Sequence, residues 1–81
     1  MRISVIIPTL NEQINITALI NSLKHSGGAA LAEIIVVDAG SSDQTETVAQ
    51  KAGAKVIKSP MRGRAVQMNY GTKFATGDIL Y

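Results

Sequence analysis

The sequence predicts an α/β fold: a three-layer, Rossmann-like parallel sheet built in the order β-α-β-α-β-α-β. Short apolar runs rich in β-branched residues recur at residues 3–7, 33–37, 55–58 and 78–81, and such runs predict strands. The first two runs do not alternate with polar residues, so we expect both strands to be buried on both faces. Helical patterns separate the runs, and strands joined by helices form parallel sheets with right-handed crossovers.

The first strand is predicted at residues 3–7, where Pro8 ends it because proline cannot donate to a sheet ladder. A helix should follow, with Asn11 or Asn15 as its N-cap and residues 27–28, both glycine, at its end. Its apolar residues have the spacing i, i+3, i+4, i+7 and are Ile16, Leu19, Ile20 and Leu23.

The second strand, at residues 33–37, leads through a tight turn into a second helix that should begin at Asp43. Asp43 and Glu46 have the spacing of a capping box. Gly53 stands where a helix C-terminus is expected. The third strand, at residues 55–58, is flanked by lysines, as edge strands often are.

A third helix is predicted from residue 63 or 64 to about Thr76, followed by a fourth strand at residues 78–81. One face of this helix should carry Ala65, Met68, Thr72 and Ala75. Gly71 inside a helix costs about 1 kcal/mol relative to alanine, so we expect the helix to lie close against the sheet at that point.

Composition excludes several classes of function. The chain has 81 residues, enough for one small domain, and no cysteine, which excludes disulfides and thiolate metal sites. His25 is the only histidine, which excludes multi-histidine metal sites. A net charge of +2 is too small to indicate nucleic-acid binding. We expect no transmembrane segment and no signal peptide, and therefore a cytoplasmic protein.

The turn after the first strand argues against two common nucleotide sites. It contains no G-x-G-x-x-G and no Walker-type phosphate loop. Glu12 would also place a negative charge where a pyrophosphate should bind. A nicotinamide-dependent oxidoreductase is therefore disfavoured.

Charged residues instead follow three of the predicted strands. Glu12 and Asp38 come after the first and second strands, and Arg62 and Arg64 after the third. Carboxylates accept hydrogen bonds from a base or from ribose hydroxyls, and arginines bind phosphate oxygens bidentately. Because ligands of open parallel sheets bind at the carboxyl ends of the strands, this pattern suits a nucleoside diphosphate with its base towards Asp38 and its phosphates towards Arg64.

The chain resembles family 2 glycosyltransferases with the GT-A fold in four motifs: P-T-L-N-E at 8–12, V-V-D-A-G-S-S-D-Q-T at 36–45, R-G-R-A-V-Q-M-N-Y-G at 62–71 and A-T-G-D-I-L-Y at 75–81. The third motif is similar to that of small bacterial members of the family. The resemblance implies a nucleotide-sugar donor, a divalent metal (Mg or Mn) and inversion at the anomeric carbon. It also implies that Thr9 and Glu12 line the nucleoside site, that Asp38 accepts from the base and that Arg64 lies near the base or diphosphate. We therefore assign nucleotide binding to Pro8, Thr9, Asn11, Glu12, Asp38 and Arg64.

Some of these residues have plainer interpretations. Asp38 is followed by a tight turn, where aspartate is common, and Glu12 could be an acid in the first turn of a helix. Asp43 is better explained as a helix cap than as a ligand. Arg64 at a helix start is electrostatically unfavourable and calls for a reason.

In the family that the chain resembles, the metal-binding acidic motif follows the fourth strand, just past Tyr81, and the catalytic base comes later. We therefore expect residues 1–81 to be a partial domain, the nucleotide half of an enzyme, with no catalytic or metal-binding residue and inactive alone. Two alternatives remain: a non-catalytic nucleotide-binding or oligomerising module, and a nucleotidyltransferase. The edges of the partial sheet also predict a homo-oligomer.

Overall fold

The computed structural model describes residues 2–80 and shows the predicted alternation of strands and helices. Its elements are β1 (Ile3–Thr9), α1 (Gln13–Gly27), the short 3₁₀ helix η1 (Gly28–Ala30), β2 (Leu31–Asp38), α2 (Thr45–Lys51), β3 (Lys55–Lys58), α3 (Arg64–Thr72) and β4 (Asp78–Leu80). Tyr81, predicted as the last residue of the fourth strand, lies outside the described residues.

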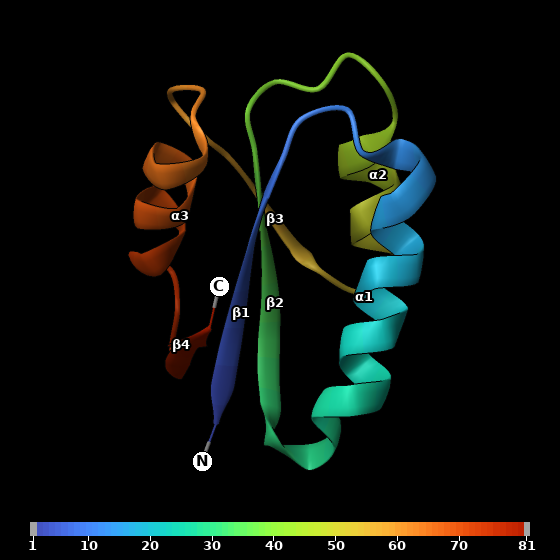
Figure 1. Cartoon of the computed structure of the whole chain (residues 1–81), viewed down its shortest axis with the longest axis vertical. Helices are drawn as coiled ribbons and strands as arrows, with labels where there is room; N and C mark the ends of the chain where they lie inside the picture. Colours follow the sequence, from blue (N-terminus) through green and yellow to red (C-terminus); the bar gives the residue numbers. More distant parts are fainter. Residues whose placement is uncertain (1, 81) are drawn as a thin grey trace.

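The four strands form one parallel sheet in the order β3-β2-β1-β4. The α/β fold class is therefore confirmed, and β3 is an edge strand as its flanking lysines predicted. Helices α1 and α2 cover one face of the sheet and α3 covers the other, which gives the three layers visible in Figure 1.

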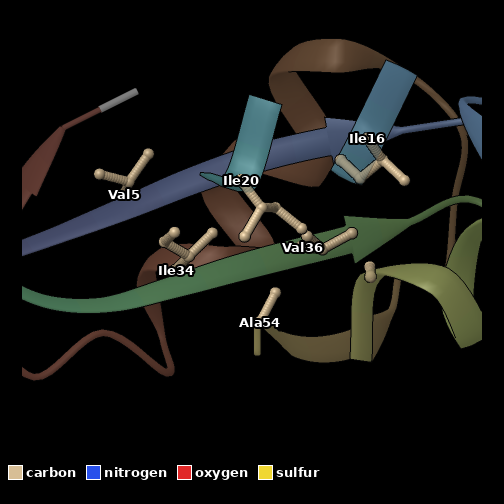
Figure 2. Close-up of a cluster of buried hydrophobic side chains, with 7 residues drawn as sticks. Val5, Ile16, Ile20, Ile34, Val36 and Ala54 are labelled. Carbon is tan, nitrogen blue, oxygen red and sulfur yellow. The ribbon is translucent and has the colours of Figure 1, made fainter. Parts of the chain in front are cut away.

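Each face of the sheet carries its own apolar core. The larger core packs α1 and α2 against β1 and β2 and contains Val5, Ile16, Ile20, Ile34, Val36, Ala49 and Ala54 (Figure 2). The smaller core lies under α3 and contains Ile6, Ile35 and Val37. Neighbouring strand residues therefore serve opposite cores, which explains why the apolar runs of β1 and β2 do not alternate with polar residues.

Two strands are longer than predicted. β1 continues through Pro8 to Thr9, so the expectation that Pro8 ends it was wrong. The described pairing of β4 with β1 covers only Ile3–Val5, so β1 behaves as an edge strand at Pro8, where proline is tolerated. β2 likewise extends beyond residues 33–37 at both ends.

The helix boundaries also required correction. α1 begins at Gln13, and neither Asn11 nor Asn15 caps it. α2 begins at Thr45 rather than at Asp43, whose carboxylate instead accepts a hydrogen bond from the Thr45 N–H at 2.9 Å in a local turn. α3 ends at Thr72, earlier than predicted.

The buried face of α3 differs in part from the predicted one. The fully buried residues are Gln67 and Gly71, and Ala65 is exposed. Met68 and Thr72 are half-buried, and Ala75, just beyond the helix, packs against the smaller core as predicted. The close approach predicted at Gly71 is confirmed, because a Cβ atom there would lie 2.7 Å from methyl groups of both Ile6 and Val37. Contact of the helix with the sheet, rather than an apolar stripe, therefore determines which side of α3 is buried.

Across residues 2–80, the helices are too short or too polar for any of them to traverse a bilayer.

Candidate functional site

The topology of the sheet creates a crevice beside β1. The chain adds β2 and β3 on one side of β1 and then crosses to add β4 on the other, so α1 and α3 flank β1 on opposite faces (Figure 1). In open parallel sheets, ligands bind at such a reversal, outside the carboxyl ends of the strands.

A groove of about 330 Å³ lies at this position, between the carboxyl half of β1, α1 and the start of α3. Its floor and one wall are apolar, formed in part by Ile7, Pro8 and the half-exposed Leu19. Its polar groups come from Thr9, Glu12, Asn15 and Arg64. Four of the six residues predicted from the sequence, Pro8, Thr9, Glu12 and Arg64, therefore line one groove.

Asp38 lies behind this groove rather than on its surface. Its side chain is 0% exposed, and its two oxygens accept four hydrogen bonds: from the Thr9 hydroxyl at 2.7 Å, the Ser41 hydroxyl at 2.5 Å, and the N–H groups of Gly40 and Ser41 at 3.1 and 2.8 Å. Burial raises the pKa of Asp38, but the hydrogen bonds from Ser41 and Thr9 outweigh it and hold the pKa below its ordinary value. Asp38 is therefore an ionised residue that fixes Thr9 and the turn after β2.

Asn11 joins the loop after β1 to the loop after β2. Its side-chain oxygen accepts from the Ser42 N–H at 2.9 Å, and its own N–H donates to the Ser41 hydroxyl at 2.8 Å. Its φ of 56° is a left-handed conformation, which asparagine tolerates better than most residues. Asn11 thus fixes the loops after β1 and β2, which we call the rim of the groove, but it does not line the groove itself.

A second set of hydrogen bonds fastens the same two loops. The Glu12 N–H donates to the Thr45 hydroxyl at 2.9 Å, and the Gln13 N–H donates to Asp43 at 3.2 Å. The Thr45 hydroxyl in turn donates to Asp43. Hydrogen bonds to the partly exposed Asp43 lower its pKa, the largest effect coming from the Thr45 hydroxyl. The sequence prediction of Asp43 as a structural residue is supported, although its partner is this turn and not a capping box.

A separate hollow of about 460 Å³ lies on the β3 side of the rim and includes Glu46, Lys58 and Ser59. Burial raises the pKa of Glu46, and the neighbouring Asp38 carboxylate raises it further, against the opposing effect of Lys58. None of the six predicted residues lines this hollow. Four of the six predicted residues therefore lie on the β1 side of the rim, whereas Asp38 and Asn11 contact the loop that lines the hollow.

A sequence profile of glycosyl transferase family 2 matches residues 4–81. The chain belongs to this family. Among curated relatives, glucosyl-3-phosphoglycerate synthase of Mycolicibacterium smegmatis is 34% identical over 86 residues, which cover 96% of the chain and 28% of the relative. An uncharacterised glycosyltransferase of Rickettsia felis is 38% identical over 77 residues, covering 95% of the chain and 26% of that protein.

The fold of this family 2 chain also matches solved structures. One is glucosyl-3-phosphoglycerate synthase from Mycobacterium tuberculosis in complex with Mn²⁺, UDP-glucose and phosphoglyceric acid, with a TM-score of 0.85 and 32% identity. The match covers 96% of the chain and 31% of the solved chain. The chain thus spans between about a quarter and a third of the length of these relatives, and the predicted GT-A architecture is confirmed for this part.

The described residues do not fit a metal centre. Residues 2–80 contain no group of three or more histidine, cysteine, aspartate or glutamate side chains that could hold a metal ion. The acids at the rim, Asp38 and Asp43, are engaged by hydroxyl and N–H donors. No step of a reaction can be assigned to metal-binding groups of these residues.

Reasoning from the sequence missed two residues of the site: Asn15, which was considered only as a helix cap but lines the groove, and Gln67. Gln67 lies on α3, is only 5% exposed, and contacts the ends of β1 and β2. A search for apolar stripes does not find a buried amide. The position of Gly71 could have revealed it, because the residue four positions earlier in a helix lies on the same face.

Proposed function

We propose that the groove beside β1 binds the nucleotide of a nucleotide-sugar donor, and that the chain is the N-terminal nucleotide-binding part of an inverting family 2 glycosyltransferase. The observation that carries this proposal is the convergence of Pro8, Thr9, Glu12 and Arg64 on one groove at the switch point of the sheet. These residues come from two distant parts of the sequence, and an apolar groove with a few convergent polar groups is typical of ligand sites.

The charges of the groove suit the two halves of a nucleotide. Arg64 is exposed at the first turn of α3, where no acidic residue balances it. A cation beside the positive end of a helix is favoured only when an anion binds there, so this end suits the diphosphate. Glu12, exposed at the start of α1, can accept hydrogen bonds from ribose hydroxyls or from a base N–H.

Asp38 has two possible ways to act on the nucleotide. It holds the Thr9 hydroxyl in place from behind the groove, and it reaches a base directly only if the half-buried Ser41 hydroxyl turns away from it. We propose the first, because Asp38 is buried and does not line the groove, and because Ser41 lines the separate hollow, so that rotation of its hydroxyl would open Asp38 towards that hollow.

The chain is proposed to be inactive alone. It spans 28% of the M. smegmatis relative, and residues 2–80 contain no cluster of side chains that could hold a metal ion, which supports this proposal. The Mn²⁺ and UDP-glucose bound by the M. tuberculosis relative support a divalent metal and a uridine nucleotide for a full-length enzyme. A cytoplasmic location stays a prediction.

Titration of the chain with UDP, GDP and dTDP, followed by NMR amide shifts, tests the proposal. We expect one nucleotide to perturb the amides of Thr9, Glu12 and Arg64. Arg64→Ala should weaken its binding about tenfold or more, because a charge-assisted hydrogen bond contributes about 1.5–3 kcal/mol.

Lys51→Ala is the matched control, because it removes the same charge from an exposed position at the far end of α2. Equal loss of binding in both variants would indicate only a general charge effect. Perturbations confined to the hollow beside Glu46 would refute the assignment of the groove.

A further inference from the structure

Gln67 joins three separate parts of the chain through one side-chain amide. Its Nε2 atom donates to the Val37 carbonyl at 2.8 Å and to the Thr9 carbonyl at 3.1 Å. Its Oε1 atom accepts from the Gly63 N–H at 3.2 Å. Both amide protons and the amide oxygen are therefore used, inside a region where Gln67 is 5% exposed.

The three partners belong to the parts of the molecule that build the groove. Thr9 ends β1 and its hydroxyl binds Asp38, Val37 precedes Asp38 in β2, and Gly63 precedes Arg64. Gly63 has a φ of 135°, so the turn before α3 has a conformation that other residues rarely adopt. The Gln67 amide lies where these three segments meet.

We infer that Gln67 is a positioning residue for the nucleotide groove: it fixes the start of α3 against the ends of β1 and β2, and so sets where Arg64 stands opposite Thr9 and Glu12. The inference rests on the proposed function. Gly71 supports it, because this contact holds the C-terminal end of α3 on the sheet and leaves the helix start to be fixed by Gln67.

A residue with a purely structural role would lower stability without altering the groove. Gln67→Met tests this distinction, because methionine keeps the length and volume of glutamine but cannot form the three hydrogen bonds. Val56→Ala is the matched control, since it weakens the core on the opposite face of the sheet at a β3 residue that does not line the groove. The two variants can be compared at temperatures at which each is fully folded.

Gln67→Glu adds a readout that depends on pH. A carboxylate facing two carbonyl oxygens in a buried position is repelled by them, so the pKa of the new carboxyl should be raised above its ordinary value. The charged groups nearby are Arg62 and Arg64 at the start of α3 and, on the other face of the sheet, Asp38; β1 carries none. With its carboxyl protonated at low pH, the variant should therefore keep the start of α3 fixed against the ends of β1 and β2. It should lose this contact as pH rises.

Two measurements on the 81-residue chain test the inference. The first uses spin labels at Asn21→Cys and Ala65→Cys, exposed positions on α1 and α3 in a chain without other cysteines. The distance distribution should be narrow in the parent chain, broad in Gln67→Met, and broad only at higher pH in Gln67→Glu. The Val56→Ala control should keep a narrow distance distribution.

The second measurement is UDP affinity, which Gln67→Met should reduce about tenfold while Val56→Ala leaves it unchanged. A narrow distance distribution and full affinity in Gln67→Met would overturn the inference. If the parent chain binds no nucleotide, the proposed function fails, and the spin-label distances still decide whether Gln67 positions the start of α3. If Gln67→Met does not fold, the pH dependence of Gln67→Glu decides the same question.

Discussion

At the scale of single residues, the site depends on buried polar groups whose hydrogen bonds are all made. Asp38 is the clearest case, because four donors surround a carboxylate with no exposed surface. Leaving such donors without an acceptor costs about 1–3 kcal/mol for each group. The shape of the rim therefore depends strongly on the charge state of Asp38.

Asp38→Asn should destabilise the chain by about 2–3 kcal/mol at neutral pH, because an amide nitrogen would face hydrogen-bond donors. The pKa of Asp38 lies below its ordinary 3.8 in the folded chain, so its stabilising effect is present above about pH 3.8 and is lost as pH falls further. The difference between the variant and the parent chain should accordingly shrink below that pH. Urea unfolding measured across this pH range checks the prediction.

Asp78→Asn serves as the control, since it removes the same charge from an exposed position in β4. A stability difference for Asp38→Asn that stays constant down to pH 2 would contradict the explanation.

Which residues of the site could be predicted depended on their chemistry. Glu12 and Arg64 could be predicted at this edge because they follow apolar strands, and parallel strands end at the same edge, whereas Pro8 and Thr9 were assigned only through the resemblance to family 2 glycosyltransferases. The burial of Asp38 could not be predicted, because it depends on the Ser41 turn folding back over the carboxylate. Gln67 was missed because its partners are backbone carbonyls, which the sequence does not mark.

At the scale of elements, strand and helix identities followed from local sequence while their ends depended on tertiary contacts. β1 extends through Pro8 because its pairing with β2 continues to Thr9, whose carbonyl accepts from the Ala39 N–H at 3.0 Å. α2 begins later than predicted because the Asp43 carboxylate accepts hydrogen bonds from the Gln13 N–H, at the start of α1, and from the Thr45 N–H. After α3 the chain continues in turns to Ala75, and the Thr76 N–H then donates to the Glu33 carboxylate at 2.7 Å, a hydrogen bond that lowers the pKa of Glu33.

Gly71→Ala should destabilise the packing of α3. Alanine favours the helix by about 1 kcal/mol, but its Cβ would overlap methyl groups of Ile6 and Val37 at 2.7 Å, and overpacking typically costs about 1–3 kcal/mol. We expect a net loss of about 1–2 kcal/mol, which lowers Tm by several degrees in a chain of this size.

A double-mutant cycle with Val37→Ala isolates the overlap, because Val37→Ala removes one of the two methyl contacts. The cost of Gly71→Ala should be smaller in that background. An unchanged cost would mean that the loss does not arise from contact with β2.

At the scale of the whole molecule, the two edges of the sheet differ. Lysines flank the β3 edge, which discourages pairing with another chain, whereas β4 exposes 42% of Ile79 at the other edge. We propose that the chain self-associates through β4. Light scattering should give a mass above 8.6 kDa that falls towards this value on dilution and in Ile79→Lys.

Val66→Lys is a suitable control, because it places the same charge at an exposed apolar position on α3, away from both edges. A monomer at every concentration would refute self-association, and association that survives Ile79→Lys would place the contact elsewhere.

The order of strands in the sheet also affects how the chain is made. β1 is synthesised before β2 and β4, yet it lies between them. The apolar side chains and the backbone hydrogen-bonding groups of β1 therefore leave the ribosome without a partner. They stay unpaired until residues 31–38, and then 78–80, have followed. Because pairing across such sequence separations is slow, the nascent chain is most vulnerable to aggregation in this interval, and added apolarity in β1 would reduce the yield of folded protein even where it left the finished structure unchanged.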